Sequence, residues 1–480
     1  MILRKKDLQK LGTSWMPFAD VASDGLTLAQ LLRMSLFQVS VGMATVLLLG
    51  TLNRVMIVEL SVPAMVVAAM IAIPVLVAPF RALLGHRSDT HRSAIGWKRV
   101  PYLWFGSLWQ MGGLAVMPFA LIVLSGDQFH GPDWAGEVLA ALAFLMTGIG
   151  LHMTQTAGLA LASDRASDDT RPRVVALLYV MFLVGMGASA IIVGWLLRDF
   201  DSLLLVKVVQ GCGVATMVFN IIALWKQEKI RPMTRAERDA PRPRFSDAWA
   251  DLMAGGEAGR LLAVVVVGTL AFNMQDVLLE PYGGEILGLS VSQTTLLTAM
   301  YALGALVGFV CAGRWLARGL DPYRMAARGI LFGVVAFSAV IFAAPLHSAL
   351  LFYAGAGMIG LGAGLFAVST LHAAMSLDTR GAGAGLALGA WGAAQATAAG
   401  LSIFFGGTIR DVVGHLATAG ALGPALNDPS LGYSVVYHFE IGLLFATLVV
   451  LGPLVRVGIP YVKKPTNSTE AQLRLAEFPT

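Results

Sequence analysis

The chain has 480 residues, of which 56% are hydrophobic and 13% are charged, and its mean hydropathy is +0.72. These values lie far from those of soluble globular proteins and indicate a membrane protein. They leave no room for a separate globular enzyme domain, because the predicted spans occupy roughly 240 positions at about 20 residues each. The net charge of +5 would favour nucleic acid in a soluble protein. Here it follows the membrane topology, so no nucleic-acid partner is expected.

Long apolar segments recur along the chain, and short polar gaps separate them. A helix needs about 20 mostly apolar residues to cross the hydrocarbon core of a bilayer. Twelve segments meet this requirement, so the sequence predicts an all-α membrane protein with 12 transmembrane helices. The predicted spans are 31–53, 62–83, 101–124, 135–163, 174–197, 203–225, 260–280, 294–313, 326–345, 348–375, 383–406 and 435–457.

Lysine and arginine fall almost entirely in every second gap between these segments. Of the 34 cationic residues, only Arg54, Arg198, Lys207 and Arg410 lie on the opposite side. Cytoplasmic loops carry the excess of lysine and arginine in membrane proteins, so both termini are predicted to be cytoplasmic. The same charges are expected to attract anionic membrane lipids.

The longest gap, which is rich in arginine, proline and acidic residues, divides the chain into six spans plus six. Two such halves are typical of transporters with a central cavity. The predicted organisation is a cytoplasmic N-terminal segment at 1–30, an N-terminal six-helix bundle at 31–225, a cytoplasmic linker at 226–259, a C-terminal six-helix bundle at 260–457 and a cytoplasmic tail at 458–480.

Residues with the spacing of a catalytic or metal site are not found in the sequence. Cys212 and Cys311 fall inside predicted helices, lack metal-ligand spacing and are expected to be packing residues. Neither a nucleophile–base pair nor a phosphate-binding loop is visible. We therefore predict that the protein is not an enzyme, holds no protein-bound metal and uses no soluble cofactor.

The gap between the second and third segments carries a recognisable motif. It runs from Gly85 to Pro101 and includes Asp89. A glycine, an aspartate four residues later, a second glycine and a basic pair resemble the loop signature of the major facilitator superfamily. An aspartate near a helix end can accept backbone hydrogen bonds or pair with an arginine, and so latch the two bundles on the cytoplasmic side. The alternative is a merely positive loop. The motif residues are Gly85, Asp89, Gly96, Lys98 and Arg99.

Three polar residues share one face of the predicted seventh helix. Asn273, Asp276 and Glu280 are spaced i, i+3 and i+7. Ionisable groups inside a membrane are costly and are by default functional. Asp276 lies about 16 residues, or roughly 24 Å, beyond the cytoplasmic boundary, which places it in the outer half of the bilayer.

The end of the predicted first helix carries a second polar group, formed by Asn53, Arg54 and Glu59. If the two halves are related, Arg54 and Asp276 occupy corresponding depths with opposite charges. We therefore predict an Arg54–Asp276 ion pair that closes the periplasmic side. In the alternative interpretation, Arg54, Glu59 and Glu280 are hydrated charges at the membrane interface.

Three segments together resemble the PucC/LhaA family, the bacteriochlorophyll-delivery branch of the major facilitator superfamily. The resemblance covers about residues 30–457, and its third segment is the most specific. Lys98 stands where an arginine is expected, which is a mild departure. The segments are Thr51–Leu60 (TLNRVMIVEL), the loop RSD…GWKRVPY within 87–102, and Gln275–Gly284 (QDVLLEPYGG).

This resemblance implies the major facilitator superfamily fold and an assembly factor for a bacterial light-harvesting antenna, LH1 or LH2. It implies binding or delivery of bacteriochlorophyll, with carotenoid as an associated pigment. The implied partners are the antenna α/β polypeptides, the reaction centre–LH1 complex and pigment-synthesis enzymes. The implied location is the bacterial inner membrane, in its intracytoplasmic photosynthetic part.

His152 and His372 are the histidines deep inside predicted spans. Neutral imidazole is a common metal ligand, so either side chain could coordinate the magnesium of a chlorophyll-type ring. Alternatively, each is a hydrogen-bonded packing residue.

Two further functions compete with the assembly factor. A proton-coupled secondary transporter of a small solute would use Asp276 or Glu280 to bind the proton. A membrane enzyme of pigment synthesis is disfavoured, because the sequence lacks the aspartate-rich motif that binds a metal diphosphate.

Overall fold

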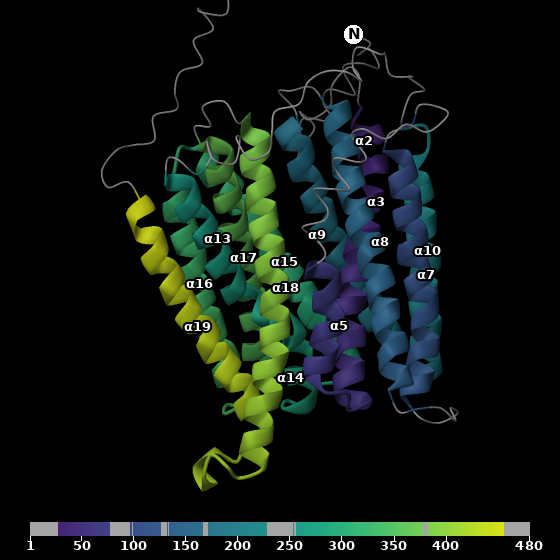
Figure 1. Ribbon diagram of the computed structural model, residues 1–480, viewed down its shortest axis with the longest axis vertical. Coiled ribbons are helices and arrows are strands. Elements are labelled where there is room, and N and C mark those ends of the chain that lie inside the picture. Colours follow the sequence, from purple (N-terminus) through teal and green to yellow (C-terminus); the bar gives the residue numbers. More distant parts are fainter. Residues whose placement is uncertain are drawn as a thin grey trace, which may run out of the picture.

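The computed structural model describes residues 27–76, 97, 99–125, 132, 134–166, 171–227, 253, 256–377 and 383–455, and in these ranges it contains helices and no strand (Figure 1). Most of the predicted N-terminal segment, most of the predicted linker and the whole predicted tail lie outside them. The first half contains α2 (Leu28–Met34), α3 (Leu36–Thr45), α4 (Leu52–Arg54), α5 (Ala64–Leu76), α7 (Val100–Leu124), α8 (Ala135–Arg165), α9 (Arg171–Leu196) and α10 (Ser202–Leu224). The second half contains α13 (Glu257–Asn273), α14 (Leu279–Glu285), α15 (Val291–Ala317), α16 (Pro322–Ala343), α17 (Ala349–Ser376), α18 (Gly383–Thr418) and α19 (Leu431–Leu451).

The twelve predicted apolar segments each coincide with a helical run. In the described part of the chain, ten runs are long and apolar enough to cross a membrane. The second segment appears as the shorter α5, and the eleventh appears as the 36-residue α18, which is not one of the ten. The protein is therefore a multi-pass membrane protein, while the number of twelve crossings stays a prediction.

Local polar residues determine where several helices begin. Ser290 and Gln293 form a reciprocal capping box at the start of α15. The Asp201 carboxylate accepts the Leu204 N–H at the start of α10. Such side chains satisfy the backbone N–H groups that have no partner in the first turn of a helix. The helices can therefore start at the membrane surface without leaving these groups unpaired.

The first and seventh spans are irregular. The first runs over Leu28–Glu59 and contains π-helical turns at Val46–Thr51 and Val55–Glu59. The seventh is interrupted by a 3₁₀ turn at Met274–Val277 and continues as α14. The predicted span at 260–280 is therefore present, and a 3₁₀ turn interrupts its helix. Because π-helical turns occur frequently at functional sites, and a 3₁₀ stretch inside a helix often marks a functional hinge, both spans are candidates for the site.

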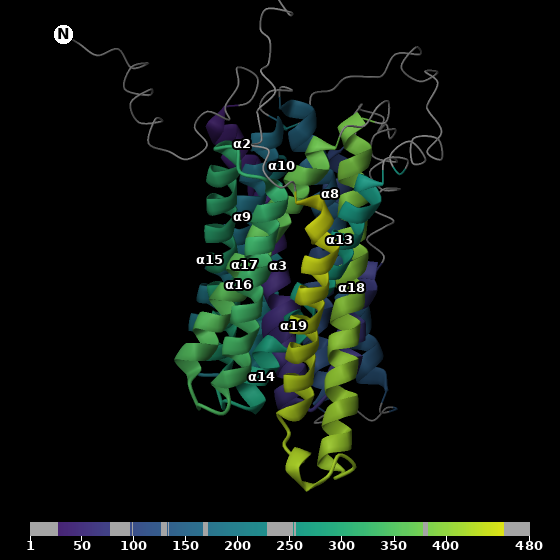
Figure 2. The same ribbon diagram turned by 90° about the vertical axis from the view of Figure 1, so that its left-hand side faces the viewer.

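The helices form two groups that meet along two seams. Helices α3, α5, α7, α8, α9 and α10 pack among themselves, as do α13, α15, α16, α17, α18 and α19. One seam joins α5 to α18, and the other joins α9 to α15 (Figures 1 and 2). The start of α2 and the end of α19 lie at the same end of the molecule (Figure 1). We call this the inner end, following the predicted topology, and the opposite end the outer end.

Glycines allow α15 and α17 to pack with their backbones in direct contact. A Cβ added at Gly308 would lie 2.6 Å from the Leu361 carbonyl oxygen, and one added at Gly364 would lie 2.6 Å from the Ala305 carbonyl oxygen. Such approaches are too short for a carbon atom, so glycine is required at both positions. Small residues at helix crossings provide the close van der Waals packing on which association in lipid depends.

We expect Gly308→Ala to lower the stability of the solubilised protein by about 2 kcal/mol, because the new methyl group must push the two helices apart. Gly313→Ala in the same helix is the matched control, since its Cβ would meet no atom within 4 Å. Thermal unfolding in detergent compares the two variants. Equal midpoints for both would contradict the proposed close packing.

Candidate functional site

A cavity of about 220 Å³ lies where α9 of the first half meets α13, α15, α17 and α18 of the second. We call it the aromatic chamber, because seven aromatic side chains line it. Its only charged or amide lining groups among the described residues are Asn273 and Gln395. The chamber therefore offers an apolar, ring-lined surface at the junction of the halves. The aromatic residues are Tyr179, Phe182, Phe272, Tyr301, Phe309, Phe366 and Trp391.

A second cavity of about 200 Å³ adjoins the aromatic chamber on the outer side. The two share Phe182, Met186 and Tyr301 as lining residues. We call it the polar chamber, because acidic, amide and hydroxyl side chains line it. An amphiphilic ligand would therefore meet two chemically different surfaces along one path. The polar lining residues are Thr45, Gln275, Asp276, Glu280, Thr298 and Tyr301.

The interruption of the seventh span presents Asp276 to the polar chamber. The Asn273 amide donates to Asp276 Oδ2 at 2.8 Å, and the Gln275 amide donates to Asp276 Oδ1. The Glu280 side chain is 3% exposed and accepts a hydrogen bond from the Thr298 hydroxyl. The predicted group of Asn273, Asp276 and Glu280 is thus present. Its members do not share one face of a single helix, because Asn273 ends α13, Asp276 lies in the 3₁₀ turn and Glu280 lies in α14.

Glu440 of α19 forms a hydrogen bond with the backbone of the interruption in the seventh span. Its side chain is fully buried, and its Oε1 accepts the backbone N–H of Gln275 at 2.8 Å. The turn leaves backbone N–H groups without a partner in the helix, and lipid offers no acceptor for them. The Glu440 carboxyl group, from a neighbouring helix, accepts a hydrogen bond there instead. Glu440 was not among the site residues predicted from the sequence. A signal was present, because it is the single acidic residue in the apolar segment 435–457.

Asn53 and Arg54 join the first span to the second half. The Asn53 amide donates to the Val277 carbonyl at 2.8 Å, and Arg54 Nη2 donates to the Leu289 carbonyl at 3.1 Å. Arg54 forms its ion pair with Glu59. The predicted Arg54–Asp276 pair is therefore wrong. The alternative of hydrated interfacial charges also fails for Arg54 and Glu280, because both side chains are buried.

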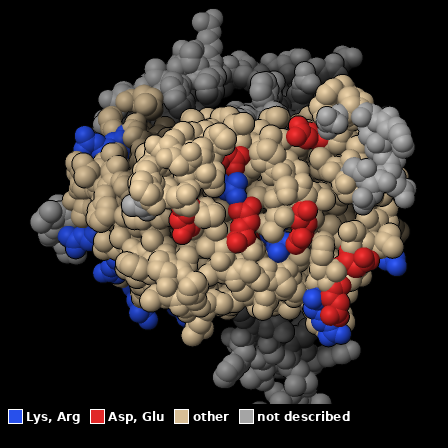
Figure 3. All heavy atoms as spheres, turned by 90° about the horizontal axis from the view of Figure 1, so that it is seen from below, with Lys and Arg blue, Asp and Glu red and all other residues tan. Residues whose placement is uncertain are grey.

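Arg410 and Asp411 form a second contact between the halves at the outer end. Asp411 Oδ2 accepts the backbone N–H of Met65, at the start of α5, at 2.6 Å. Arg410 pairs with Asp411 and with Glu285 of α14, and its guanidinium lies 4.8 Å from the centre of the Tyr433 ring. Figure 3 shows acidic and basic side chains side by side on this end of the molecule.

The halves are thus tied together at the outer end. The hydrogen bonds of Asn53, Arg54 and Asp411 all cross between them there, and so does a contact between the hydroxyls of Thr51 and Thr295 at 3.3 Å. These side chains, together with the packed seams, hold the two halves in contact at the outer end.

The cytoplasmic loop motif falls largely outside the described residues, which include only its last member. Arg99 begins α7, is buried, and donates from Nε to Asp164 of α8 at 3.0 Å. Both residues belong to the first half, so this ion pair does not bridge the halves. The latch predicted for Asp89 stays a prediction. The motif members outside the described residues are Gly85, Asp89, Gly96 and Lys98.

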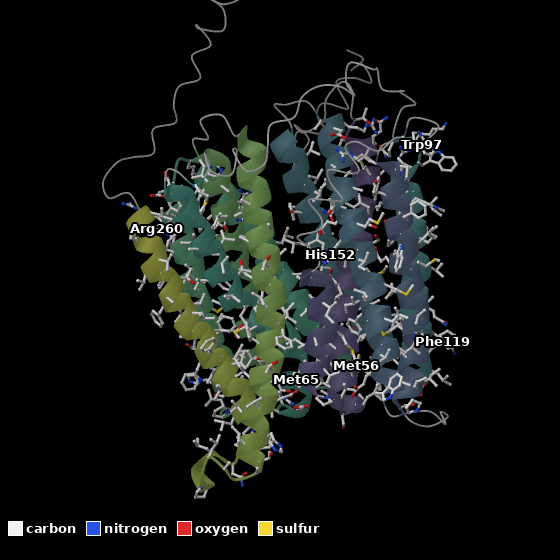
Figure 4. All side chains as sticks on the ribbon, in the orientation of Figure 1. Met56, Met65, Trp97, Phe119, His152 and Arg260 are labelled. Carbon is white, nitrogen blue, oxygen red and sulfur yellow. The ribbon has the colours of Figure 1, made fainter. Side chains whose placement is uncertain are left out.

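His152 in α8 and His372 in α17 are half-buried, and neither lines the aromatic or the polar chamber. His152 lies near mid-height of the molecule (Figure 4). In the part of the chain that the structure describes, no three His, Cys, Asp or Glu side chains gather as a metal site would require. Pigment ligation by either histidine remains a prediction.

Solved structures with the same arrangement of helices are membrane transporters. The nucleoside transporter NupG superposes with a TM-score of 0.64 at 13% identity, covering 88% of this chain and 99% of NupG. The D-xylose-proton symporter superposes with a TM-score of 0.60 at 15% identity, covering 88% and 96%. At these identities the likeness establishes the fold alone, and it confirms the predicted major facilitator superfamily fold.

The sequence model of the PUCC protein family matches residues 51–459. The chain belongs to the PucC family. It is 68% identical over 480 residues, the full length of both chains, to the "uncharacterized protein in puhA-bchM intergenic region" of Rhodobacter capsulatus. It is 55% identical over 408 residues to Protein PucC of Rhodovulum sulfidophilum, covering 84% of this chain and 89% of that one. This family member is therefore a PucC-type membrane protein linked to photosynthesis.

Proposed function

We propose that the protein is a non-enzymatic assembly factor for a bacterial light-harvesting antenna, and that it binds bacteriochlorophyll and hands it to antenna polypeptides. Membership of the PucC family supports the link to photosynthesis. The observation that carries the proposal is the aromatic chamber, whose seven rings lie at the junction of the two halves. Aromatic faces pack well against a flat conjugated ring and against an apolar tail.

The size of the chambers limits how the pigment would bind. Pockets that enclose a drug-sized ligand usually measure about 300–1,000 Å³. The two chambers hold about 220 and 200 Å³, so they cannot enclose a whole pigment in this conformation. Among the described residues, the hydrogen bonds of Asn53, Arg54 and Asp411 join the halves at the outer end, so the proposal requires the chambers to widen from the inner end.

The proposed partners are single-span antenna α/β polypeptides, with carotenoid, the reaction centre–LH1 complex and pigment-synthesis enzymes as further associates. The lipid-facing surface supports such docking. Gly442 of α19 is exposed and has open space beside it, which would let another helix approach closely. The proposed location is the photosynthetic part of the bacterial inner membrane, with both termini in the cytoplasm.

The polar chamber favours one alternative, a proton-coupled transporter of a small solute. Asp276 and Glu280 line this cavity, and buried carboxyl groups serve as proton relays in transporters. Solute flux in proteoliposomes that Asp276→Asn abolishes would support transport. Absence of any proton-driven flux would favour the assembly factor.

Filling the aromatic chamber tests the assembly function. Ala367 of α17 lines the chamber, and Ala354 of the same helix is exposed on the outer surface. We expect Ala367→Trp to lower the antenna absorbance of host membranes about tenfold, because the new ring occupies the space for the pigment. Ala354→Trp should leave the absorbance unchanged at equal protein level. Equal absorbance for both variants would contradict pigment binding in the chamber.

A further inference from the structure

A groove of about 470 Å³ lies between α7 and α10 on the outside of the first half, near its inner end. Trp97 marks this place in Figure 4. The walls are mainly aromatic, and Trp104, Phe105 and Trp225 are exposed there. Tryptophans at this depth are typical of the membrane interface, so the aromatic walls alone do not identify a ligand. The lining residues are Trp97, Val100, Pro101, Trp104, Phe105, Ile221, Leu224, Trp225, Lys226 and Gln227.

One polar group in the groove lacks a partner. Gln227 is 3% exposed, and its Oε1 accepts a hydrogen bond from Arg165. Its Nε2 is buried and has no hydrogen-bond acceptor. Buried polar groups in native proteins are nearly always hydrogen-bonded. An acceptor oxygen from outside the described residues would satisfy the Gln227 amide.

Positive charge gathers around the same amide. Lys226 precedes it, is exposed, and has a φ of 53°, the left-handed conformation that the residue after a helix C-cap commonly adopts. Arg33 Nη2 donates to the Trp225 carbonyl at 2.7 Å, and Arg165 contacts Gln227 itself. By this hydrogen bond Arg33 caps the C-terminus of α10, and capping accounts for the position of the Arg33 side chain. Capping does not account for the unpartnered donor of Gln227.

We propose that this groove binds one anionic phospholipid. Its phosphate would accept from Gln227 Nε2 beside Lys226, and its acyl chains would lie along Trp104 and Phe105. Basic pockets between membrane helices on the cytoplasmic side bind anionic headgroups in this way. An uncharged pigment would fit the aromatic walls but would offer no negative charge to Lys226.

Native mass spectrometry of the full-length protein in detergent tests this site, with phosphatidylglycerol and phosphatidylcholine as the added lipids. We expect the protein to retain one phosphatidylglycerol about tenfold more strongly than phosphatidylcholine. Lys226→Gln should weaken this preference about fivefold. Gln227→Leu should also weaken it, because the leucine cannot donate to the phosphate. Lys207→Gln, which changes an exposed lysine near the other end of α10, is the matched control and should have no effect.

Equal retention of the two lipids would overturn the proposal. So would an unchanged preference in Lys226→Gln, a variant at an exposed side chain that is expected to fold normally. Loss of a pigment instead of a phospholipid from Gln227→Leu would assign the groove to the pigment and would also contradict the proposal.

Discussion

Glu440→Leu is expected to lower the free energy of unfolding of the solubilised protein by about 3 kcal/mol. The substitution removes the acceptor for the Gln275 N–H in the interruption of the seventh span. Lipid and apolar side chains provide no replacement, so a backbone donor stays buried without a partner. The turn that presents Asp276 should then lose its fixed geometry.

Glu440→Gln is the matched control, because glutamine keeps an acceptor oxygen of the same size at the same place. Its expected loss of stability is below about 1 kcal/mol. Thermal unfolding in detergent measures both variants. If leucine and glutamine destabilise the protein equally, the hydrogen bond to Gln275 does not fix the turn.

Arg54→Met is expected to open the chambers from the outer end. Arg54 is 4% exposed and ties the first span to the second half through the Leu289 carbonyl. Methionine preserves much of the bulk of arginine but donates no hydrogen bond, so the halves lose one of their polar ties. A thiol placed in the polar chamber should become reachable from the outer side.

Thr45→Cys supplies that thiol, in a chain whose Cys212 and Cys311 are replaced, because Thr45 lines the polar chamber. A membrane-impermeant thiol reagent added from the outer side should label it about tenfold faster in Arg54→Met. Arg198→Met is the matched control, since Arg198 is exposed and pairs with the adjacent Asp199. Equal labelling rates in the two variants would show that Arg54 does not hold the chambers closed.

The sequence predicted the fold because its signals are local. Runs of about 20 apolar residues indicate spans wherever they occur, and they need no knowledge of their neighbours. The interruption at Met274–Val277 could not be predicted in this way. It depends on Glu440, which is 165 residues away and meets Gln275 only after α19 packs beside α13.

Only part of the candidate site could be predicted, because only some of its signals are local in the sequence. Asp276, Glu280, Asn53 and Arg54 were selected because charged and amide groups in apolar segments are costly. Their partners were not predictable from an assumed symmetry of the halves. Arg54 pairs with Glu59, five residues along the chain, because the π-helical turn between them brings both side chains together. The aromatic chamber draws its seven rings from five helices, and no sequence pattern relates those rings.

Gentle solubilisation of the full-length protein from photosynthetic membranes, followed by its absorption spectrum and the identification of bound polypeptides, tests the proposed function most directly. The prediction is that bacteriochlorophyll bands and antenna polypeptides co-purify with the protein, and that Ala367→Trp loses the pigment while Ala354→Trp keeps it. A spectrum without pigment bands, in a preparation without antenna polypeptides, would contradict the proposed function.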